Sequence, residues 1–157
     1  MKIYLETTVP NFLFHDDAPE KQRVTQEFFR WAETSQDEFY VSRAVIDELD
    51  LAPEPKRSRM KEALSHLSPQ TLDITAEALE LAERYVRSGI LSPQFYPDAL
   101  HVALAVCSGI DIVVSWNLKH LVNARRIERF NALNHSSGLP PVRIHTPEEV
   151  MEYEEEE

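Results

Sequence analysis

The amino-acid sequence predicts an α/β protein, a three-layer α/β/α sandwich whose central, mainly parallel sheet has about five strands. Short apolar runs alternate along the chain with longer segments in which apolar residues recur at helical spacing. The first run, residues 2–5, does not alternate strictly, as expected of a strand that is covered on both faces. Because strands and helices alternate, right-handed crossovers should make neighbouring strands parallel.

The first half of the chain is predicted to contain three helices and two strands, of which residues 2–5 are the first strand. Helical spacing covers residues 20–34, and the segment EFYVS, residues 38–42, follows as the second strand. Ser42 is suited to cap a helix that runs to about Leu51, where the two prolines of APEPK end it. A third helix turns the apolar residues of 60–67 inward.

The second half continues the alternation. The strand TLDIT ends at Thr75, which is positioned to cap the next helix, and Gly89 ends that helix. Pro97 stands where the first turn of another apolar helix tolerates proline. The remaining predicted elements are a strand over 110–115, a mostly helical segment over 116–134, a short strand within 138–146 and a terminal helix from Pro147.

Length and composition indicate one domain. The chain has 157 residues, 43% of them hydrophobic, which is enough for a core of its own. We expect this domain to span residues 1–150 and residues 151–157 to form a frayed acidic tail. The net charge of −11 argues against sequence-independent adhesion to nucleic acid, which depends on neutralising phosphates. Because five of these charges belong to glutamates in the tail, the sign is weak evidence about partners.

The single cysteine, Cys107, can form neither an intrachain disulfide nor a thiolate metal site, so any metal must bind to oxygen or imidazole. No run approaches the roughly 18 apolar residues of a membrane helix. The N-terminus lacks a cationic segment followed by an apolar one. We therefore expect a cytoplasmic protein with no membrane partner.

Four oxygen-bearing side chains fall near one edge of the predicted sheet. Glu6 ends the first strand and Asn117 follows the fourth. Asp98 opens the helix that leads into the fourth strand, and Glu48 lies in the helix after the second. Ligands of such sheets bind outside the carboxyl ends of the strands, so we expect these side chains to converge there.

Convergence of three carboxylates requires a cation or bound protons. Two carboxylates about 5 Å apart repel by roughly 3 kcal/mol at an effective dielectric constant near 20. Mg²⁺ and Mn²⁺ prefer hard oxygen ligands and keep several waters, so either ion suits such a site. The sequence therefore predicts a Mg²⁺ or Mn²⁺ cofactor.

Four segments resemble, in this order, the PIN domain, and more narrowly the VapC-like toxin ribonucleases: IYLETTVP, SRAVIDEL, YPDALHVALAV and DIVVSWNLKHLVN. The resemblance covers nearly the whole chain. It implies a PIN-like sandwich, an acidic pocket for Mg²⁺ or Mn²⁺, and metal-dependent cleavage of RNA by the toxin of a type II toxin–antitoxin pair. It also implies a homodimer and a small antitoxin protein as partner.

The resemblance makes Glu6, Glu48, Asp98 and Asn117 the catalytic residues. We expect Glu6 and Asp98 to bind the metal directly, and Glu48 and Asn117 to act directly or through water. Glu48 is equally a candidate to accept a proton from the nucleophile. The first position is usually Asp in the family and the fourth is often Asp. Since Asn117 lacks a charge, we expect one firmly bound ion and reduced activity.

Other side chains are candidates for support or for substrate contact. Hydrogen bonds from Thr7, Thr8 and Ser115 are expected to support the carboxylates or a substrate phosphate. The candidates for contact with the RNA backbone are Lys119, His120, Arg125 and Arg126, with a second basic run at Lys56, Arg57, Arg59 and Lys61. Both runs equally suit solvated helix faces or the rim of a dimer.

Simpler roles compete with these functions. Asp98, taken alone, equally suits the dipole of a helix N-terminus, and Glu48 could belong to a solvated acidic face. A hydrogen-bonded structural role is favoured over metal ligation for His101. Packing is favoured over base stacking for Trp116.

Two other functions stay open. The first is a catalytically weak or inactive PIN-like domain that binds RNA or a protein, which Glu6 and Asn117 favour. The second is a Mg²⁺-dependent phosphoacceptor or phosphatase, but that chemistry needs a nucleophilic aspartate. The strand ends carry Glu6, Ser42, Thr75 and Ser115 instead, so the nuclease is preferred.

Overall fold

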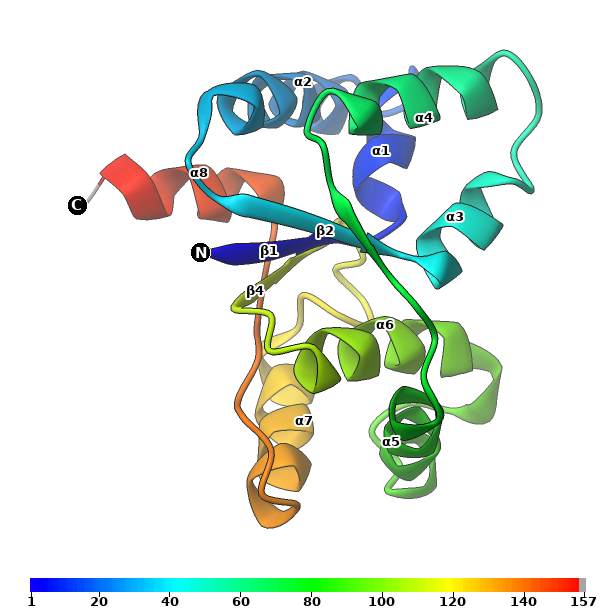
Figure 1. The fold of residues 1–157 in the computed structure, drawn as a ribbon, viewed down its shortest axis with the longest axis vertical. Coiled ribbons are helices and arrows are strands. Elements are labelled where there is room, and N and C mark those ends of the chain that lie inside the picture. Colours follow the sequence, from blue (N-terminus) through cyan, green and yellow to red (C-terminus); the bar gives the residue numbers. More distant parts are fainter. Residues whose placement is uncertain (156–157) are drawn as a thin grey trace.

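The computed structural model describes residues 1–155 and forms a five-stranded, all-parallel sheet between two layers of helices (Figure 1). The order across the sheet is β3-β2-β1-β4-β5, and each neighbouring pair is parallel. The predicted α/β/α sandwich is therefore confirmed. The strands are β1 (Lys2–Leu5), β2 (Glu38–Ser42), β3 (Gln70–Leu72), β4 (Ile112–Val114) and β5 (Arg143–His145).

The helices of the described chain cover both faces of the sheet. They are α1 (Thr8–Leu13), α2 (Pro19–Thr34), α3 (Arg43–Leu49), α4 (Lys56–Ser65), α5 (Ala76–Arg87), α6 (Tyr96–Cys107), α7 (Ala124–Ser136) and α8 (Pro147–Glu155), with a 3₁₀ turn, η1 (Pro93–Phe95), before α6. Helices α1, α2, α4 and α8 lie on one side of the sheet, and α5, α6 and α7 lie on the other (Figure 1).

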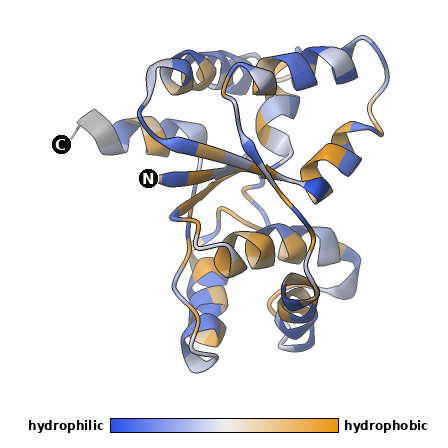
Figure 2. Ribbon diagram, in the orientation of Figure 1, coloured by the Kyte–Doolittle hydropathy of each residue, from blue (hydrophilic) through white to orange (hydrophobic). Residues whose placement is uncertain are grey.

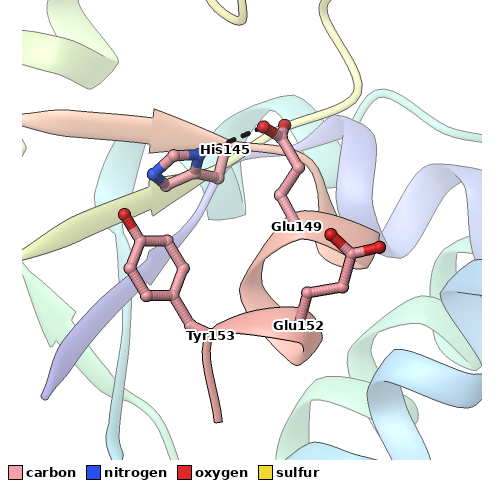
Figure 3. Close-up of a pocket in the computed structure, with 4 residues that line it drawn as sticks. All are labelled: His145, Glu149, Glu152 and Tyr153. Atoms are coloured by element: carbon pink, nitrogen blue, oxygen red, sulfur yellow. Dashed lines mark hydrogen bonds and ion pairs between the residues drawn. The ribbon is translucent and has the colours of Figure 1, made fainter. Parts of the chain in front are cut away.

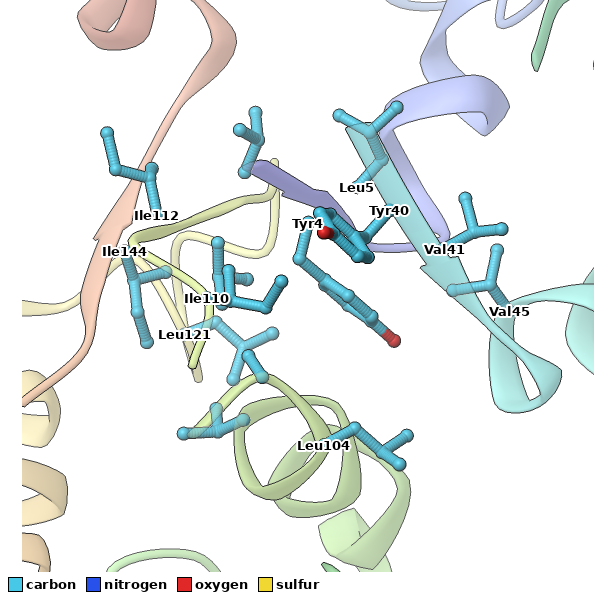
Figure 4. Packing of buried hydrophobic residues seen from close by; sticks show 14 of the residues in the cluster. Tyr4, Leu5, Tyr40, Val41, Val45, Leu104, Ile110, Ile112, Leu121 and Ile144 are labelled. Atoms are coloured by element: carbon cyan, nitrogen blue, oxygen red, sulfur yellow. The ribbon is translucent and has the colours of Figure 1, made fainter. Parts of the chain in front are cut away.

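β1 is the central strand, and its side chains are buried from both sides. Ile3 pairs in register with Phe39 of β2 and with Ile112 of β4. Ile3, Tyr4 and Leu5 have no exposed surface. Tyr4 points from β1 toward α6, where Leu104 lies (Figure 4). Apolar residues concentrate on the strands and on the helix surfaces that face them (Figure 2), which explains why the strand sequences do not alternate.

The predicted helix ends are confirmed at several positions. The Ser42 side chain caps α3 by accepting a hydrogen bond from the Val45 N–H at 3.3 Å. Thr75 caps α5 by accepting from the Ala78 N–H at 3.1 Å. Gly89 follows α5 with φ = +78°, a conformation that glycine adopts without steric strain.

Helix α1 and the start of α7 differ from the prediction. The six-residue helix α1 was not predicted, because it is too short to display a helical period. The segment predicted to be mostly helical from residue 116 forms a helix only from Ala124, where Asn123 caps α7. Before it, Asn117 Oδ1 accepts a hydrogen bond from the His120 N–H at 3.0 Å. Asparagine side chains compete with helical hydrogen bonds in this way, so the segment turns before α7 begins.

The C-terminal helix α8 continues past residue 151, where the acidic tail was expected to start, and residues 156–157 of that tail lie outside the described part. Thr146 and Glu149 form a reciprocal cap at its start. The Thr146 N–H donates to Glu149 Oε1 at 2.9 Å, and the Glu149 N–H donates to Thr146 Oγ1 at 3.2 Å. Glu149 also contacts His145 beside a shallow pocket that Glu152 and Tyr153 complete (Figure 3).

Among the described residues, no helix is both long and apolar enough to cross a membrane.

The reciprocal cap predicts a pH-dependent loss of stability in Glu149→Ala. Burial raises the pKa of Glu149, but hydrogen bonds from the Thr146 N–H and from His145 outweigh it and lower the pKa below 4.5. The stabilisation is therefore complete above the pKa of the unfolded chain and is lost as the pH falls. We expect the substitution to lower the free energy of unfolding by about 1 kcal/mol at pH 7.

Urea unfolding at neutral pH and at about pH 3 checks this expectation, since a glutamate is largely protonated at the lower value. The difference between wild type and Glu149→Ala should narrow at the lower pH. Glu148→Ala removes a neighbouring exposed carboxylate outside the cap and serves as the control. A difference that does not depend on pH would contradict the assigned role of the carboxylate.

Candidate metal centre

The carboxyl-terminal edge of the sheet carries an acidic cluster. Glu6 follows β1 directly and is buried, with 3% of its surface exposed. One carboxylate oxygen of Glu6, one of Glu48 and one ring nitrogen of His101 all lie within 4.8 Å of one another. Glu6 follows β1, whereas Glu48 lies in α3 and His101 in α6. The predicted convergence of Glu6 and Glu48 is observed, and His101 lies beside them.

Two hydroxyl groups hold the Glu6 side chain. Thr8 Oγ1 donates to Glu6 Oε1 at 2.5 Å, and Ser115 Oγ donates to the same oxygen at 2.7 Å. Thr8, at the start of α1, and Ser115, just after β4, are therefore both in contact with the carboxylate. The Oγ1 atom of Thr7 is instead buried without a hydrogen-bond partner in the described chain.

Backbone amides after β4 anchor these hydroxyl groups. The Trp116 N–H donates to Thr8 Oγ1 at 2.8 Å, and the Asn117 N–H donates to Ser115 Oγ at 2.9 Å. Each hydroxyl thus accepts from the main chain and donates to Glu6. Such supporting hydrogen bonds orient a potential ligand before a cation arrives.

His101 holds the second carboxylate. Its Nε2 atom lies 2.6 Å from Glu48 Oε1, and its Nδ1 atom lies 2.7 Å from the hydroxyl oxygen of Tyr4. The ring is 1% exposed, whereas the Glu48 side chain is 37% exposed. The hydrogen-bonded role that the sequence favoured for His101 is confirmed. Tyr4 was missed, although a tyrosine in an otherwise apolar central strand needs a buried hydrogen-bond partner.

The charges of the site act on His101 against the effect of burial. Burial lowers the pKa of His101, but the hydrogen bond with Glu48 outweighs it, together with the negative charges of Glu6, Glu48 and Asp98. The net result is a pKa above the ordinary value of 6.5. The negative charges around His101 therefore favour the protonated form of its ring.

Asp98 lies close to the cluster but outside the group of three atoms. It is half-buried in the first turn of α6. Burial raises its pKa, and the charge of Glu6 raises it further, while a hydrogen bond from the Asn117 side chain acts in the opposite direction. Repulsion between Asp98 and Glu6 is thus present in the folded chain, and a cation between them would relieve it.

The side chain of Asn117 closes the turn after β4. Its Oδ1 atom accepts from the His120 N–H at 3.0 Å. Asn117 also acts on Asp98, because it lowers the pKa of that carboxyl. The oxygen expected to serve as a ligand already has one partner.

The donors fit a hard divalent cation. Glu6 and Glu48 each direct Oε1 at a protein group, and neither Oε2 atom has a hydrogen-bond partner among the described residues. Both ring nitrogens of His101 are occupied, so carboxylate oxygens rather than imidazole are the available ligands. The carboxylates of Glu6 and Glu48 can bind a metal ion here, with water completing the shell.

The four candidates for RNA contact differ in exposure. Lys119 and Arg125 are exposed. The His120 ring is 8% exposed, stacks on Phe95 with ring centroids 3.9 Å apart, and has its pKa lowered by burial. Arg126 donates to the carbonyl oxygens of Lys119 and Ile90 at 2.7 and 3.3 Å. The first two are free to meet a phosphate, while the other two stabilise the segment after the site.

The second basic run is largely paired. Lys56 donates to Asn11 at 2.6 Å, Arg57 pairs with Glu54 at 2.9 Å, and Lys61 pairs with Asp50. Arg59 is exposed. These pairs agree with a solvated helix face.

Trp116 packs into the structure, as the sequence favoured. It is 8% exposed and its Nε1–H donates to Thr25 Oγ1 at 2.8 Å. Its indole is therefore anchored between β4 and α2 and does not present a free face for a base.

Comparison with protein-family models finds no match, and no curated protein matches the sequence. Among solved structures, the chain aligns with a chain in the crystal structure of VapBC2 from Rickettsia felis bound to a DNA fragment from their promoter. The TM-score is 0.58 and the sequence identity 14%, over 93% of this chain and 98% of the other. At this identity the similarity shows that the two chains share the same α/β/α fold.

Proposed function

We propose that this protein is a metal-dependent endoribonuclease of the PIN-domain, VapC-like kind that uses Mg²⁺ or Mn²⁺. The observation that carries the proposal is the set of carboxylates, Glu6, Glu48 and Asp98, gathered at the carboxyl-terminal edge of a parallel sheet. Burial, and after it repulsion from Glu6, raises the pKa of Asp98, and each of the two glutamates keeps one oxygen without a partner among the described residues. Such an arrangement is suited to a divalent cation.

The chain's own residues would share the work of phosphodiester hydrolysis. When bound, Mg²⁺ or Mn²⁺ supplies an acidified water and offsets the negative charge of the phosphate. Glu6 and Asp98 would hold the ion directly and Glu48 would hold it through water, while the hydroxyls of Thr8 and Ser115 keep Glu6 oriented. The partly exposed Glu48 is also our candidate to accept a proton from the attacking water. Lys119 and Arg125 can position the RNA backbone.

The proposal extends to partners and setting. The structural neighbour is a VapBC2 assembly bound to promoter DNA. By analogy, we propose that this chain is the toxin of a type II pair, forms a homodimer, pairs with a small antitoxin protein and acts in the cytoplasm.

A second function is favoured by one observation. Asn117 supplies no charge, and its side-chain oxygen already accepts a hydrogen bond from the His120 N–H. An inactive PIN-like domain that binds RNA or a protein would tolerate this position. Tight Mn²⁺ binding without cleavage of RNA would support that binding module.

Asp98→Asn is expected to lower RNA cleavage by at least about 100-fold, because it removes a charged ligand. A fluorescent-RNA assay with Mn²⁺, with Mg²⁺ and with chelator measures this. Asp47→Asn neutralises an exposed aspartate on α3 and should leave the rate unchanged. Equal loss in both variants, or cleavage that persists in chelator, would overturn the nuclease proposal.

The same substitution is expected to stabilise the metal-free protein. Asp98→Asn removes both a carboxylate with a raised pKa and its repulsion with Glu6, so the free energy of unfolding should rise by about 1 kcal/mol. For a chain of this size the thermal midpoint in chelator should rise by about 2–4 °C. Addition of Mn²⁺ should stabilise wild type and leave Asp98→Asn unchanged. A lower midpoint for the variant in chelator would show that Asp98 is a structural helix cap.

A further inference from the structure

A buried chain of hydrogen bonds starts and ends on helix α3. The Tyr4 hydroxyl lies 2.7 Å from Ser42 Oγ and 2.7 Å from His101 Nδ1. Ser42 Oγ accepts the Val45 N–H at 3.3 Å, and His101 Nε2 lies 2.6 Å from Glu48 Oε1. The chain therefore leaves α3 at its N-terminal cap, crosses β1 and α6, and returns to α3 at Glu48.

Burial makes the hydrogen positions in this chain countable. Ser42 and Tyr4 have no exposed surface and His101 has 1%. In a neutral ring, the Ser42 hydroxyl donates to Tyr4, Tyr4 donates to Nδ1, and Nε2–H donates to Glu48, so every hydrogen has an acceptor. In a protonated ring, Nδ1–H donates to the Tyr4 oxygen, so the Tyr4 hydroxyl donates to Ser42 Oγ instead. The Ser42 hydroxyl hydrogen then has no acceptor within this chain of hydrogen bonds. In both forms Nε2 donates to the Glu48 carboxylate.

We propose that His101 is a positioning residue for Glu48, and that Tyr4 and Ser42 hold its ring so that Nε2–H always points at Glu48 Oε1. This inference rests on the proposed function of the acidic cluster. Without the anchor at Nδ1, the ring could rotate about its side-chain bonds and release a glutamate that is partly exposed to water. With the anchor, Oε1 is occupied by the ring, and Oε2 has no hydrogen-bond partner among the described residues.

The arrangement also separates the two glutamates by the kind of donor that holds them. Glu6 receives two hydroxyl donors, whereas Glu48 receives a ring nitrogen backed by a second buried layer. Supporting partners of this kind typically contribute 10–100-fold in metal affinity or activity. Removal of the Tyr4 hydroxyl should therefore weaken the positioning of Glu48, although Tyr4 contacts neither Glu48 nor Glu6.

The test compares Tyr4→Phe with Tyr85→Phe. Tyr85 is a matched control because it is also fully buried and its hydroxyl donates to Asn134 Oδ1 at 2.5 Å, outside the acidic cluster. Mn²⁺ affinity by calorimetry is the first readout and RNA cleavage kinetics the second. We expect Tyr4→Phe to weaken Mn²⁺ binding about 10-fold and to lower kcat about 10-fold with unchanged KM. Tyr85→Phe should lower only the unfolding midpoint.

A second pair of variants keeps the proposal falsifiable if Tyr4→Phe unfolds. His101→Gln retains a side-chain amide donor at similar reach, whereas His101→Leu fills the space without one. Glutamine should restore most of the Mn²⁺ affinity that leucine loses. Equal affinity in the glutamine, leucine and wild-type proteins would overturn the positioning role, as would equal effects of Tyr4→Phe and Tyr85→Phe on Mn²⁺ affinity.

These outcomes are distinguishable from failure of the nuclease proposal. Wild-type protein that binds Mn²⁺ and cleaves no RNA would overturn the nuclease, while the affinity differences among the variants would still support or overturn the role of His101. Wild-type cleavage with unaltered affinity and kcat in Tyr4→Phe and His101→Leu would overturn the positioning role and leave the nuclease standing.

Discussion

The burial of Glu6 among other negative groups is the constraint on which the site depends. A carboxylate with 3% exposure is stable only if hydrogen bonds replace its water, and Thr8 and Ser115 supply them at 2.5 and 2.7 Å. Those hydroxyls are held by the amides of Trp116 and Asn117, which follow β4. The pairing of β1 with β4 is therefore what makes a charged residue tolerable at the end of a central strand.

The negative charges that suit the acidic cluster to a cation also lower the stability of the folded chain. Burial raises the pKa of Asp98 and the charge of Glu6 raises it further, so the folded chain keeps a repulsion that the loss of one charge would relieve. Within each glutamate the two carboxylate oxygens differ. Glu6 and Glu48 each use one oxygen for hydrogen bonds with the protein, and the other oxygen has no partner among the described residues. Strain of this kind is typical of sites prepared for a ligand of opposite charge.

Much of the fold could be predicted because its signals are local. The capping side chains of Ser42 and Thr75 predict the starts of α3 and α5, and the apolar run before Ser115 predicts β4. Helix α1 has six residues and no visible period. After β4, Asn117 closes a turn and Asn123 caps α7, although the sequence from residue 116 resembles one continuous helix. In both places side-chain hydrogen bonds to the backbone override an apolar pattern that is too short or too continuous.

The sequence by itself determined the parallel sandwich and the presence of Glu6, Glu48, Asp98 and Asn117 near one edge, because the alternation of strands with helices and the residues that follow each strand can be located from periodicity. Only the tertiary structure decided which atoms meet. It brought His101 against Glu48, joined the Asn117 side chain to the His120 amide, and joined Tyr4 to Ser42 across 38 positions of sequence. The physical reason is that hydrogen-bond partners are chosen by distance and direction between side chains on different elements, and a linear pattern carries neither.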